Sequence, residues 1–462
     1  MAGDAVEALA SACADVRPGK DADAVDGIVP AAVATPGSVA EASEVLRTAA
    51  AYDLAVLPRG SGTKLAWGPP PRRCDLVVET IRLDRIIEHA AGDLVVRAQA
   101  GVPVRHLQAE LARAGQQLAL DTPGSAADIQ GTAADAHGTV GGVIATGMAG
   151  PRRLRYGAPR DLLIGITVVL ADGTVASSGG KVVKNVAGYD LGKLFAGSRG
   201  TLGLIAEATF RLHPVPPDSS YVTLSCRGTA AAAAVVRAAM ETQLAPSAVE
   251  IDAPSRGAPI TVAVLLEGRP DAVAERSAKM RETLGGAIDA AGASAGSAAR
   301  DSLAARRAEA SAAPPDWWNR SAAGGGSILL QVAYPPAALR DVLDAIDSAA
   351  ETAGKIDPVV RGSAGTGVLA VGLDAVTSPL IGATAVPAVV AEFVTTLRQL
   401  IARQPGRGDL PGGTVTVVHA PAAVRKAVDL HGPVPALGLM RAVKDQFDPG
   451  HLMAPGRLTG GI

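Results

Sequence analysis

Cysteine, histidine and aromatic residues are all scarce in this chain of 462 residues. The three cysteines (Cys13, Cys74 and Cys226) lie far apart, so they predict neither a disulfide framework nor a four-thiolate metal site. Aromatic residues make up only 3% of the chain, which leaves few stacking platforms for single-stranded nucleic acid. The formal net charge of -2 also lacks the basic excess that nucleic-acid-binding domains usually carry. We therefore expect no nucleic-acid partner.

Long apolar runs and a basic leader are missing as well. The longest strongly apolar stretches, such as 162–170, have the length of a strand, whereas a membrane-spanning helix needs about 20 apolar residues. Residues 1–26 carry acids early and no basic region, unlike a signal peptide. We expect a soluble protein with no transmembrane segment. The expected location is the cytoplasm, where partners could hold the chain at the inner face of the membrane.

Glycine, by contrast, is abundant, with 53 residues. This excess is compatible with loose loops or with backbone placed close to a ligand. The length predicts two or three domains, and the proline-rich segment 214–217 is the predicted main boundary. The expected domains are residues 1–216, residues 217–420, and a C-terminal helix and tail, 421–462, that returns to the first domain.

The hydrophobic pattern predicts an α+β protein. A βαβ unit is expected over 31–57, with its helix beginning at Ser38 and Glu41 in the capping-box position. A helix follows that has Val104, Leu107 and Leu111 on one face. Further strands are expected at 76–80, 94–98, 162–170, 201–212, 221–226, 260–266, 327–333, 366–371 and 414–418, and further helices at 229–243, 270–284, 336–353, 386–404 and 436–447.

The first glycine-rich run, 58–68, directly follows a predicted strand. Gly60 and Gly62 allow successive N–H groups to converge on a phosphate, while Ser61 and Thr63 add hydroxyl donors. Arg59 or Lys64 can add positive charge. The run matches neither common nucleotide loop, because Leu65 occupies the place of the third glycine and no glycine-lysine pair precedes a hydroxyl residue. An equally weighted interpretation is that residues 58–68 form a simple tight turn that binds no phosphate.

Three further runs follow. The run 137–150 is uncharged and rich in glycine, which suits either backbone lying flat against a planar ligand or a helix packed closely on a sheet. In the run 153–173, Asp161 could cap a turn or orient a ligand-facing loop. The run 181–216 contains the segment 197–203, which again offers backbone N–H groups beside hydroxyls.

Taken in this order, the four runs resemble the FAD-binding domain shared by the vanillyl-alcohol oxidase and p-cresol methylhydroxylase (PCMH-type) family. The resemblance covers about 30–215, and the tail MAPGRL (453–458) is similar to the family's closing N-P-G-R/K-L. The chain is most similar to bacterial glycolate oxidase, where Lys64 and Trp67 suggest the E subunit and KNVAGYDL (184–191) is shared with the D subunit. The resemblance implies two small α+β subdomains that sandwich FAD, followed by a ferredoxin-like α+β cap domain.

The resemblance also implies which residues hold FAD. Non-covalent binding is expected, because Thr63 stands near the position where some relatives attach the flavin through a histidine. The residues expected on the pyrophosphate are Arg59, Gly60, Ser61, Gly62 and Thr63; those along the flavin are Pro123, Thr139, Gly141, Gly142, Thr146 and Gly147; and those completing the pocket are Gly157, Asp161, Gly200, Thr201 and Ile205.

The substrate site departs from the family pattern. Relatives of the D type carry G-H-x-G-D-G-N-x-H, whose histidines are thought to hold a divalent metal and the hydroxy acid, and this chain has no such run. Its seven histidines include no pair at metal-ligand spacing, so we expect no metal site. Arg361 could clamp a substrate carboxylate and His419 is the nearest histidine by position, although both also suit structural roles. Ala454 replaces the usual asparagine of the tail.

The resemblance implies an FAD-binding subunit of a glycolate oxidase-like complex that oxidises a small 2-hydroxy acid to a 2-oxo acid. Its partners would be a D-type flavoprotein subunit and an iron–sulfur subunit, because three isolated cysteines cannot bind a cluster here. Two alternatives stay open: a self-sufficient FAD-dependent 2-hydroxy-acid dehydrogenase, and a non-catalytic assembly subunit. The sequence identifies no catalytic base.

Overall fold

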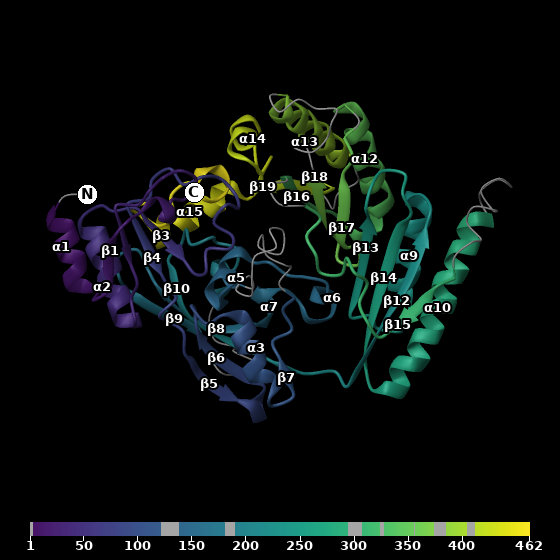
Figure 1. Cartoon of the computed structure of the whole chain (residues 1–462), viewed down its shortest axis with the longest axis horizontal. Coiled ribbons are helices and arrows are strands. Elements are labelled where there is room, and N and C mark those ends of the chain that lie inside the picture. Colours follow the sequence, from purple (N-terminus) through teal and green to yellow (C-terminus); the bar gives the residue numbers. More distant parts are fainter. Residues whose placement is uncertain are drawn as a thin grey trace. The chain divides into compact units, whose positions relative to one another are not determined.

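The computed structural model divides the chain into two compact units (Figure 1). It describes residues 3–121, 138–180, 190–293, 307–323, 328–354, 356–373, 385–403 and 412–462. Unit 1 comprises Met1–Ala149, Gly157–Val215 and Val434–Ile462, and unit 2 comprises Gly150–Tyr156 and Pro216–Pro433. The main division therefore falls inside the proline-rich segment 214–217, while residues 421–433 group with unit 2.

The first layer of unit 1 is a small sheet covered by helices α1 (Gly3–Ala12) and α2 (Val39–Ala51). Its strand order is β1 (Val16–Pro18), β2 (Ala32–Ala34), β4 (Leu76–Glu79) and β3 (Val56–Arg59), and β2, β4 and β3 run parallel. The predicted βαβ unit is thus confirmed. Ser38 caps α2, since its Oγ accepts from the Glu41 N–H at 3.1 Å.

The second layer of unit 1 is a five-stranded antiparallel sheet. Its order is β5 (Ile86–Ala90), β6 (Val95–Gln99), β10 (Leu204–Arg211), β8 (Leu163–Val169) and β9 (Val175–Gly179). Helices α3 (Val104–Ala112) and α5 (Val140–Thr146) share one apolar cluster with it. The predicted face of Val104, Leu107 and Leu111 is buried in that cluster. Short elements complete the layer: η2 (Ala91–Asp93), β7 (Gln116–Gln117), α7 (Pro159–Leu162), α8 (Gly192–Phe195) and β11 (His213–Pro214).

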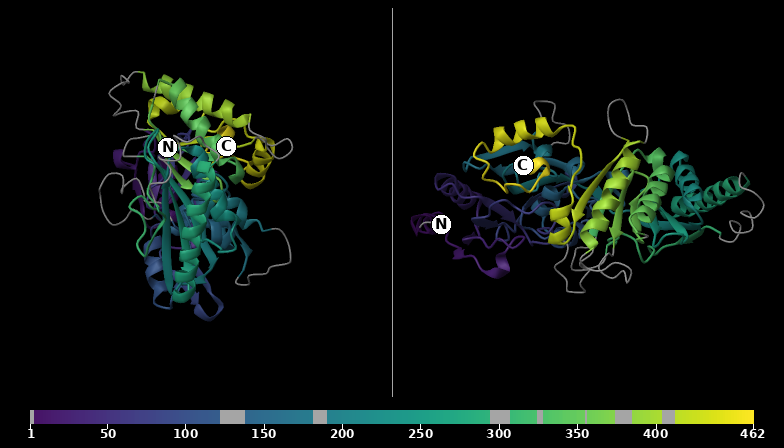
Figure 2. Two further views of the ribbon diagram at one scale, coloured as in Figure 1. Left: turned by 90° about the vertical axis from the view of Figure 1, so that its right-hand side faces the viewer. Right: turned by 90° about the horizontal axis from the view of Figure 1, so that it is seen from above.

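Unit 2 is built on an eight-stranded antiparallel sheet. Its order is β15 (Glu309–Ser311), β12 (Asp218–Cys226), β14 (Ile260–Gly268), β13 (Ala248–Ala253), β17 (Val359–Ser363), β18 (Val368–Leu373), β16 (Ile328–Ala333) and β19 (Thr414–His419). Helices α9 (Thr229–Glu241), α10 (Pro270–Ala293), α12 (Leu339–Thr352) and α13 (Val386–Ala402) can be followed as the teal-to-olive coils in Figure 2. They share the main apolar cluster of the unit with alternate strand residues such as Val222 and Leu224. This architecture confirms the expected α+β class.

Some predicted boundaries in unit 2 were wrong. The helix expected at 270–284 runs on to Ala293, because Gly285 and Gly286 meet no crowding and the alanine-rich sequence after them favours helix. Strands β13 and β17 were not predicted; in β13, Glu250 and Asp252 interrupt the apolar pattern although both side chains are buried, and in β17 Arg361 and Gly362 do so. Strand propensity alone does not anticipate buried carboxylates.

The C-terminal tail lies beside β3 in unit 1. Helix α14 (Ala422–Ala427) belongs to unit 2, and α15 (Leu437–Phe447) begins the return. Val56 donates to the carbonyl of Leu452 and accepts from the Ala454 N–H, both at 2.8 Å. The tail therefore extends the first sheet directly before the first glycine-rich run. Within the part of the chain that the structure describes, no helix has the length and apolar character needed to cross a membrane.

Candidate functional site

The first glycine-rich loop connects β3 with β4 and contacts the start of α5. A Cβ atom on Gly60 would lie 2.3 Å from Oγ1 of Thr139, so no larger residue fits there without movement. Gly62 has a φ of 76° and Gly68 a φ of 79°, a region that favours glycine. The loop is therefore shaped both by close packing and by backbone conformation.

Helix α5 packs tightly at both ends. Thr139 is its N-cap, and its Oγ1 accepts from the Gly142 N–H at 3.3 Å. A Cβ on Gly141 would lie 2.8 Å from Cβ of Ala100, next to β6. Gly147 ends the helix with a φ of 67°. The second run thus forms the closely packed helix that was one of its two interpretations, and the first turn of this helix faces the first loop.

The fourth run supplies a third segment beside these two. Arg199 donates its backbone N–H to the carbonyl of Ala145, near the end of α5, at 2.8 Å. A Cβ on Gly200 would lie 3.1 Å from the ring of Pro58. The Thr201 hydroxyl donates to the carbonyl of Ser198 at 2.7 Å, so this hydroxyl is used inside the turn.

The three segments line one pocket that lies wholly within unit 1. Backbone and side chains of its walls come from the first loop, α5, the fourth run and the C-terminal tail. Four cationic side chains are among them, and no acidic residue lines the pocket in the part of the chain described. The lining residues are Pro58, Arg59, Gly60, Ser61, Gly62, Thr63, Lys64, Leu65, Trp67, Gly138, Thr139, Gly142, Val143, Ala145, Thr146, Met148, Arg199, Gly200 and Arg457.

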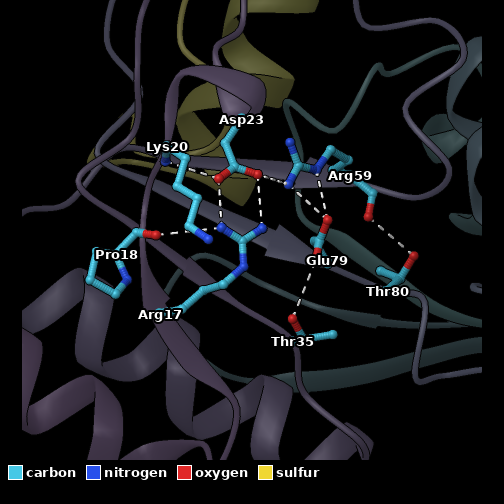
Figure 3. A network of polar contacts seen from close by, with 8 residues as sticks. All are labelled: Arg17, Pro18, Lys20, Asp23, Thr35, Arg59, Glu79 and Thr80. Atoms are coloured by element: carbon cyan, nitrogen blue, oxygen red, sulfur yellow. Dashed lines mark hydrogen bonds and ion pairs between the residues drawn. The ribbon is translucent and has the colours of Figure 1, made fainter.

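Arg59 joins the base of the first loop to two carboxylates (Figure 3). Its Nη2 lies 2.7 Å from Asp23 Oδ1 and 2.7 Å from Glu79 Oε1. Arg17 also contacts both oxygens of Asp23, at 2.6 and 2.8 Å. The hydrogen bonds from Arg17 first, and also those from Arg59, hold the pKa of Asp23 well below its usual range. The charge of Arg59 is therefore balanced by protein groups, and its guanidinium anchors the loop.

Arg457 holds the far end of the same loop. Its guanidinium donates to the carbonyls of Pro69 and Leu65, both at 2.7 Å, and lies 3.3 Å from Asp26. The C-terminal tail thus fixes the loop from outside, and its positive charge also lines the pocket.

Arg199, like Arg457, lines this pocket but was not among the site residues predicted from the sequence. Its Nη1 is buried and has no hydrogen-bond partner among the described residues. Burial, and after it the charge of Arg457, lowers the pKa of Arg199 to about 10, which still leaves the guanidinium protonated at neutral pH. A buried cation without a partner is unfavourable unless an anion binds beside it. The available signal was a cation in the glycine-rich segment 197–203.

The pocket fits the diphosphate of the FAD that the resemblance implies. Gly60 and Gly62 place loop backbone at its wall, and Ser61 and Thr63 add hydroxyls. The unpartnered Nη1 of Arg199 provides positive charge. An anion bound here would lie beside these hydroxyls and positive charges.

The predicted FAD-binding residues divide into two sets. The pocket wall contains Arg59, Gly60, Ser61, Gly62, Thr63, Thr139, Gly142, Thr146 and Gly200. The others that the structure describes pack around it or elsewhere in unit 1: Gly141, Gly147, Gly157, Asp161, Thr201 and Ile205. Asp161 caps its own turn by accepting from the Ala158 N–H at 2.8 Å. Pro123 lies outside the described residues. The roles of all these residues toward FAD stay predictions.

The two substrate candidates lie on separate strands of unit 2. Arg361, on β17, contacts Asp252 Oδ1 at 2.5 Å through Nε and donates to the carbonyl of Ser321 at 2.9 Å. His419 ends β19, and strands β18 and β16 lie between the two. The sheet therefore does not bring them together as neighbours. In the described ranges, no group of three or more His, Cys, Asp or Glu side chains could hold a metal ion.

A second polar cluster in unit 2 was not predicted. The Tyr156 hydroxyl donates to Glu267 at 3.1 Å, and Arg152 lies 3.6 Å from the same carboxylate. Burial, followed by the charge of Glu267, raises the pKa of Tyr156 to about 12. These contacts attach the segment 150–156 to the sheet of unit 2.

Comparisons with known families cover most of the chain. The family model described as "FAD binding domain" matches residues 30–179. The model described as "FAD linked oxidases, C-terminal domain" matches residues 215–458, which is more than half of the chain. The first match contains the loop and helix α5 of the pocket.

Three curated relatives each match less than half of this chain. Glycolate oxidase subunit GlcD of Bacillus subtilis is 33% identical over 228 residues, 49% of this chain and 46% of the relative. D-2-hydroxyglutarate dehydrogenase of Xanthomonas citri pv. viticola is 35% identical over 196 residues, 42% of this chain and 39% of the relative. Glycolate oxidase subunit GlcE of Escherichia coli is 36% identical over 163 residues, 35% of this chain and 43% of the relative. The chain thus spans less than half the length of each of these relatives.

A solved structure shares the fold over almost the whole chain. p-Cresol methylhydroxylase with substrate bound superposes with a TM-score of 0.69 over 98% of this chain and 96% of that chain, at 14% identity. At this low identity the similarity concerns the fold alone.

Proposed function

The chain belongs to the FAD-linked oxidases, and from this premise we propose that it takes part in the oxidation of a small 2-hydroxy acid to a 2-oxo acid. The names of the relatives support this substrate class, since they include glycolate oxidase subunits and a D-2-hydroxyglutarate dehydrogenase. The identity of the acid stays open within that class.

The observation that carries the proposal is the cationic, glycine-lined pocket of unit 1. It combines backbone of the first loop, the hydroxyls of Ser61 and Thr63, and the unpartnered cation of Arg199. These groups would hold an FAD diphosphate without a covalent bond. When bound, FAD would supply the redox chemistry that the protein side chains lack. The residues of this chain would hold FAD in position.

At a finer level, we propose an E-type subunit of a glycolate oxidase-like complex. Lys64 and Trp67 support the E type, and they form a cation–π contact, with Lys64 Nζ 5.2 Å from the centre of the Trp67 ring. The sequence lacks the G-H-x-G-D-G-N-x-H run of D-type relatives, so substrate oxidation is assigned to a companion D-type flavoprotein. Electrons would leave through an iron–sulfur subunit, because the three cysteines of this chain cannot bind a cluster. We place the complex in the cytoplasm, held at the inner face of the membrane by its partners.

A second candidate is a dehydrogenase that acts alone. The buried Asp252–Arg361 pair and the Tyr156–Glu267 contact put titratable groups in unit 2 that could serve a substrate. A third candidate, an assembly subunit without flavin, retains only the fold.

Purification of the chain without partners separates the three candidates. The proposal expects a yellow protein that absorbs near 450 nm and releases FAD on denaturation, and whose flavin keeps its colour under anaerobic glycolate or D-lactate. Bleaching of the flavin by either acid would contradict the accessory-subunit proposal and favour the self-sufficient dehydrogenase. A colourless chain that takes up no added FAD would leave only the assembly subunit.

A further inference from the structure

Arg199 has an unusual backbone conformation, and its guanidinium packs closely against the backbone at Gly68. Its φ of 53° lies in the left-handed region, which residues other than glycine seldom adopt. A Cβ on Gly68 would lie 1.8 Å from Nη1 of Arg199, so the guanidinium occupies room that only a glycine leaves. Backbone conformation and neighbouring sequence together place this guanidinium at the pocket wall.

The charged groups around Arg199 do not offset its positive charge. Arg457 faces it from the C-terminal tail and is itself positive. The acids close to the pocket are committed elsewhere: Asp23 and Glu79 contact Arg59, and Asp26 contacts Arg457. In the described part of the chain, no carboxylate forms an ion pair with Arg199. Arg199, which is half-buried with a buried Nη1, thus brings to the pocket a positive charge that no carboxylate of the described residues neutralises.

We propose that Arg199 pairs with the diphosphate bridge of the bound dinucleotide and is the main charged contact for it in this pocket. The proposal rests on the proposed function, since it takes FAD as the ligand. Guanidinium groups bind phosphate oxygens through parallel N–H bonds, and Arg199 lines the pocket without a carboxylate partner among the described residues. Arg59 and Arg457 line the same pocket, but their guanidinium groups donate to protein oxygens. These two residues therefore position the first loop.

The test compares two variants of Arg199 with a charge control in the full-length, flavin-free chain. Arg199→Met removes the charge and Arg199→Lys retains it, and all three side chains are unbranched, so the cost of the backbone conformation stays similar. Arg113→Met removes an exposed charge at the C-terminal end of α3, outside the pocket. The dissociation constant for FAD is measured by quenching of flavin fluorescence at low and high salt, and the melting temperature is measured without flavin.

We expect Arg199→Met to raise the dissociation constant for FAD by about 10- to 100-fold, the size of one charged hydrogen-bonded contact. Arg199→Lys should fall between Met and wild type, and Arg113→Met should match wild type. The salt dependence of FAD binding should decrease in Arg199→Met, because one ionic contact is missing. Without flavin, Arg199→Met should melt at or above the wild-type temperature, because it removes a buried charge that lacks a partner.

Two results would overturn the inference while leaving the proposed function intact. One is an Arg199→Met chain that binds FAD as tightly as wild type. The other is a flavin-free Arg199→Met chain that melts well below wild type while Arg199→Lys does not, which would indicate that the charge stabilises the fold itself. A wild-type chain that binds no FAD would instead refute the proposed function, and this inference with it.

Discussion

At the scale of single residues, the pocket depends on glycines, whose lack of a Cβ atom leaves room for neighbouring side chains. Gly60 and Gly68 each leave space that a neighbouring side chain occupies, Thr139 Oγ1 in one case and Arg199 Nη1 in the other. The glycine excess of the chain therefore includes positions set by close approach, in addition to those set by a positive φ.

The first prediction concerns Gly60→Ala. The new methyl group would overlap the side chain of Thr139, so the loop must move away from α5, at a cost of about 1–3 kcal/mol. We expect a lower melting temperature and a weaker affinity for FAD, measured by thermal unfolding and flavin fluorescence. Gly92→Ala is the matched control, since no atom lies within 4 Å of its Cβ position and its φ is not positive. Equal behaviour of the two variants would contradict the close-packing argument.

At the scale of elements, carboxylates join segments that are distant in sequence. Asp23 of the short helix η1 (Asp21–Asp23) contacts Arg17 in β1 and Arg59 at the end of β3, as Figure 3 shows. This network anchors the base of the first loop to the edge of the first sheet.

The second prediction is an acid-sensitive contribution from Asp23. Its folded-state pKa lies below the ordinary aspartate value of about 3.9, mainly because of Arg17. The stabilisation is present above that ordinary value and is lost as the pH falls below it. The wild-type melting temperature should therefore drop more steeply than that of Asp23→Asn between about pH 5 and pH 3, as followed by thermal unfolding at each pH. Parallel curves would show that this carboxylate does not contribute.

A second ion pair fixes the C-terminal tail. Lys444 of α15 lies 2.6 Å from Asp448, and both side chains are at most 1% exposed. Lys444 also donates to the carbonyls of Thr201 and Met453, while Asp448 accepts from the N–H groups of Leu452 and Met453. The pair thus connects the fourth run with the turn that brings the tail to β3.

The third prediction is that Lys444→Met destabilises the chain by about 3–5 kcal/mol, because Asp448 then keeps a buried charge without its cation. Urea unfolding provides the measurement. Lys279→Met is the matched control, since Lys279 pairs with Glu275 at the same i,i+4 spacing on an exposed helix face and should leave the stability close to that of the wild type. The additional change Asp448→Asn should recover part of the loss. Equal effects of the two lysine variants would disprove the argument.

At the scale of the whole molecule, the pocket belongs to unit 1 alone. Its walls come from the first loop, α5, the fourth run and the tail residue Arg457, all of which group with that unit. Unit 2 supplies a broad sheet whose buried acids, such as Asp252 and Glu267, are held by Arg361, Tyr156 and Arg152. The candidate cofactor pocket and the second sheet thus belong to separate units, and the two family models match separate spans of the chain.

Much of the local structure could be predicted from the sequence. The βαβ start, the helix face of Val104 and Leu107, and the glycine-rich first loop all follow from short-range patterns of capping, periodicity and turn residues. The resemblance to a family of FAD-binding proteins rested on the order of four such runs, and the family matches support it. These features are encoded by residues close together in the chain.

Other features depend on contacts between residues far apart, which no local pattern records. The sequence could not show that Arg59 is balanced by Asp23 and Glu79 while Arg199 has an unpartnered nitrogen, because each outcome depends on distant partners. It also could not show that segment 150–156 joins unit 2, which follows from contacts such as that between Tyr156 and Glu267. The sequence by itself thus determined many of the elements and the glycine-rich runs, although strands such as β13 and β17 were not predicted. Only the tertiary structure decided which charges are neutralised, because ion pairing depends on distances of a few ångströms between side chains more than 100 positions apart in some cases.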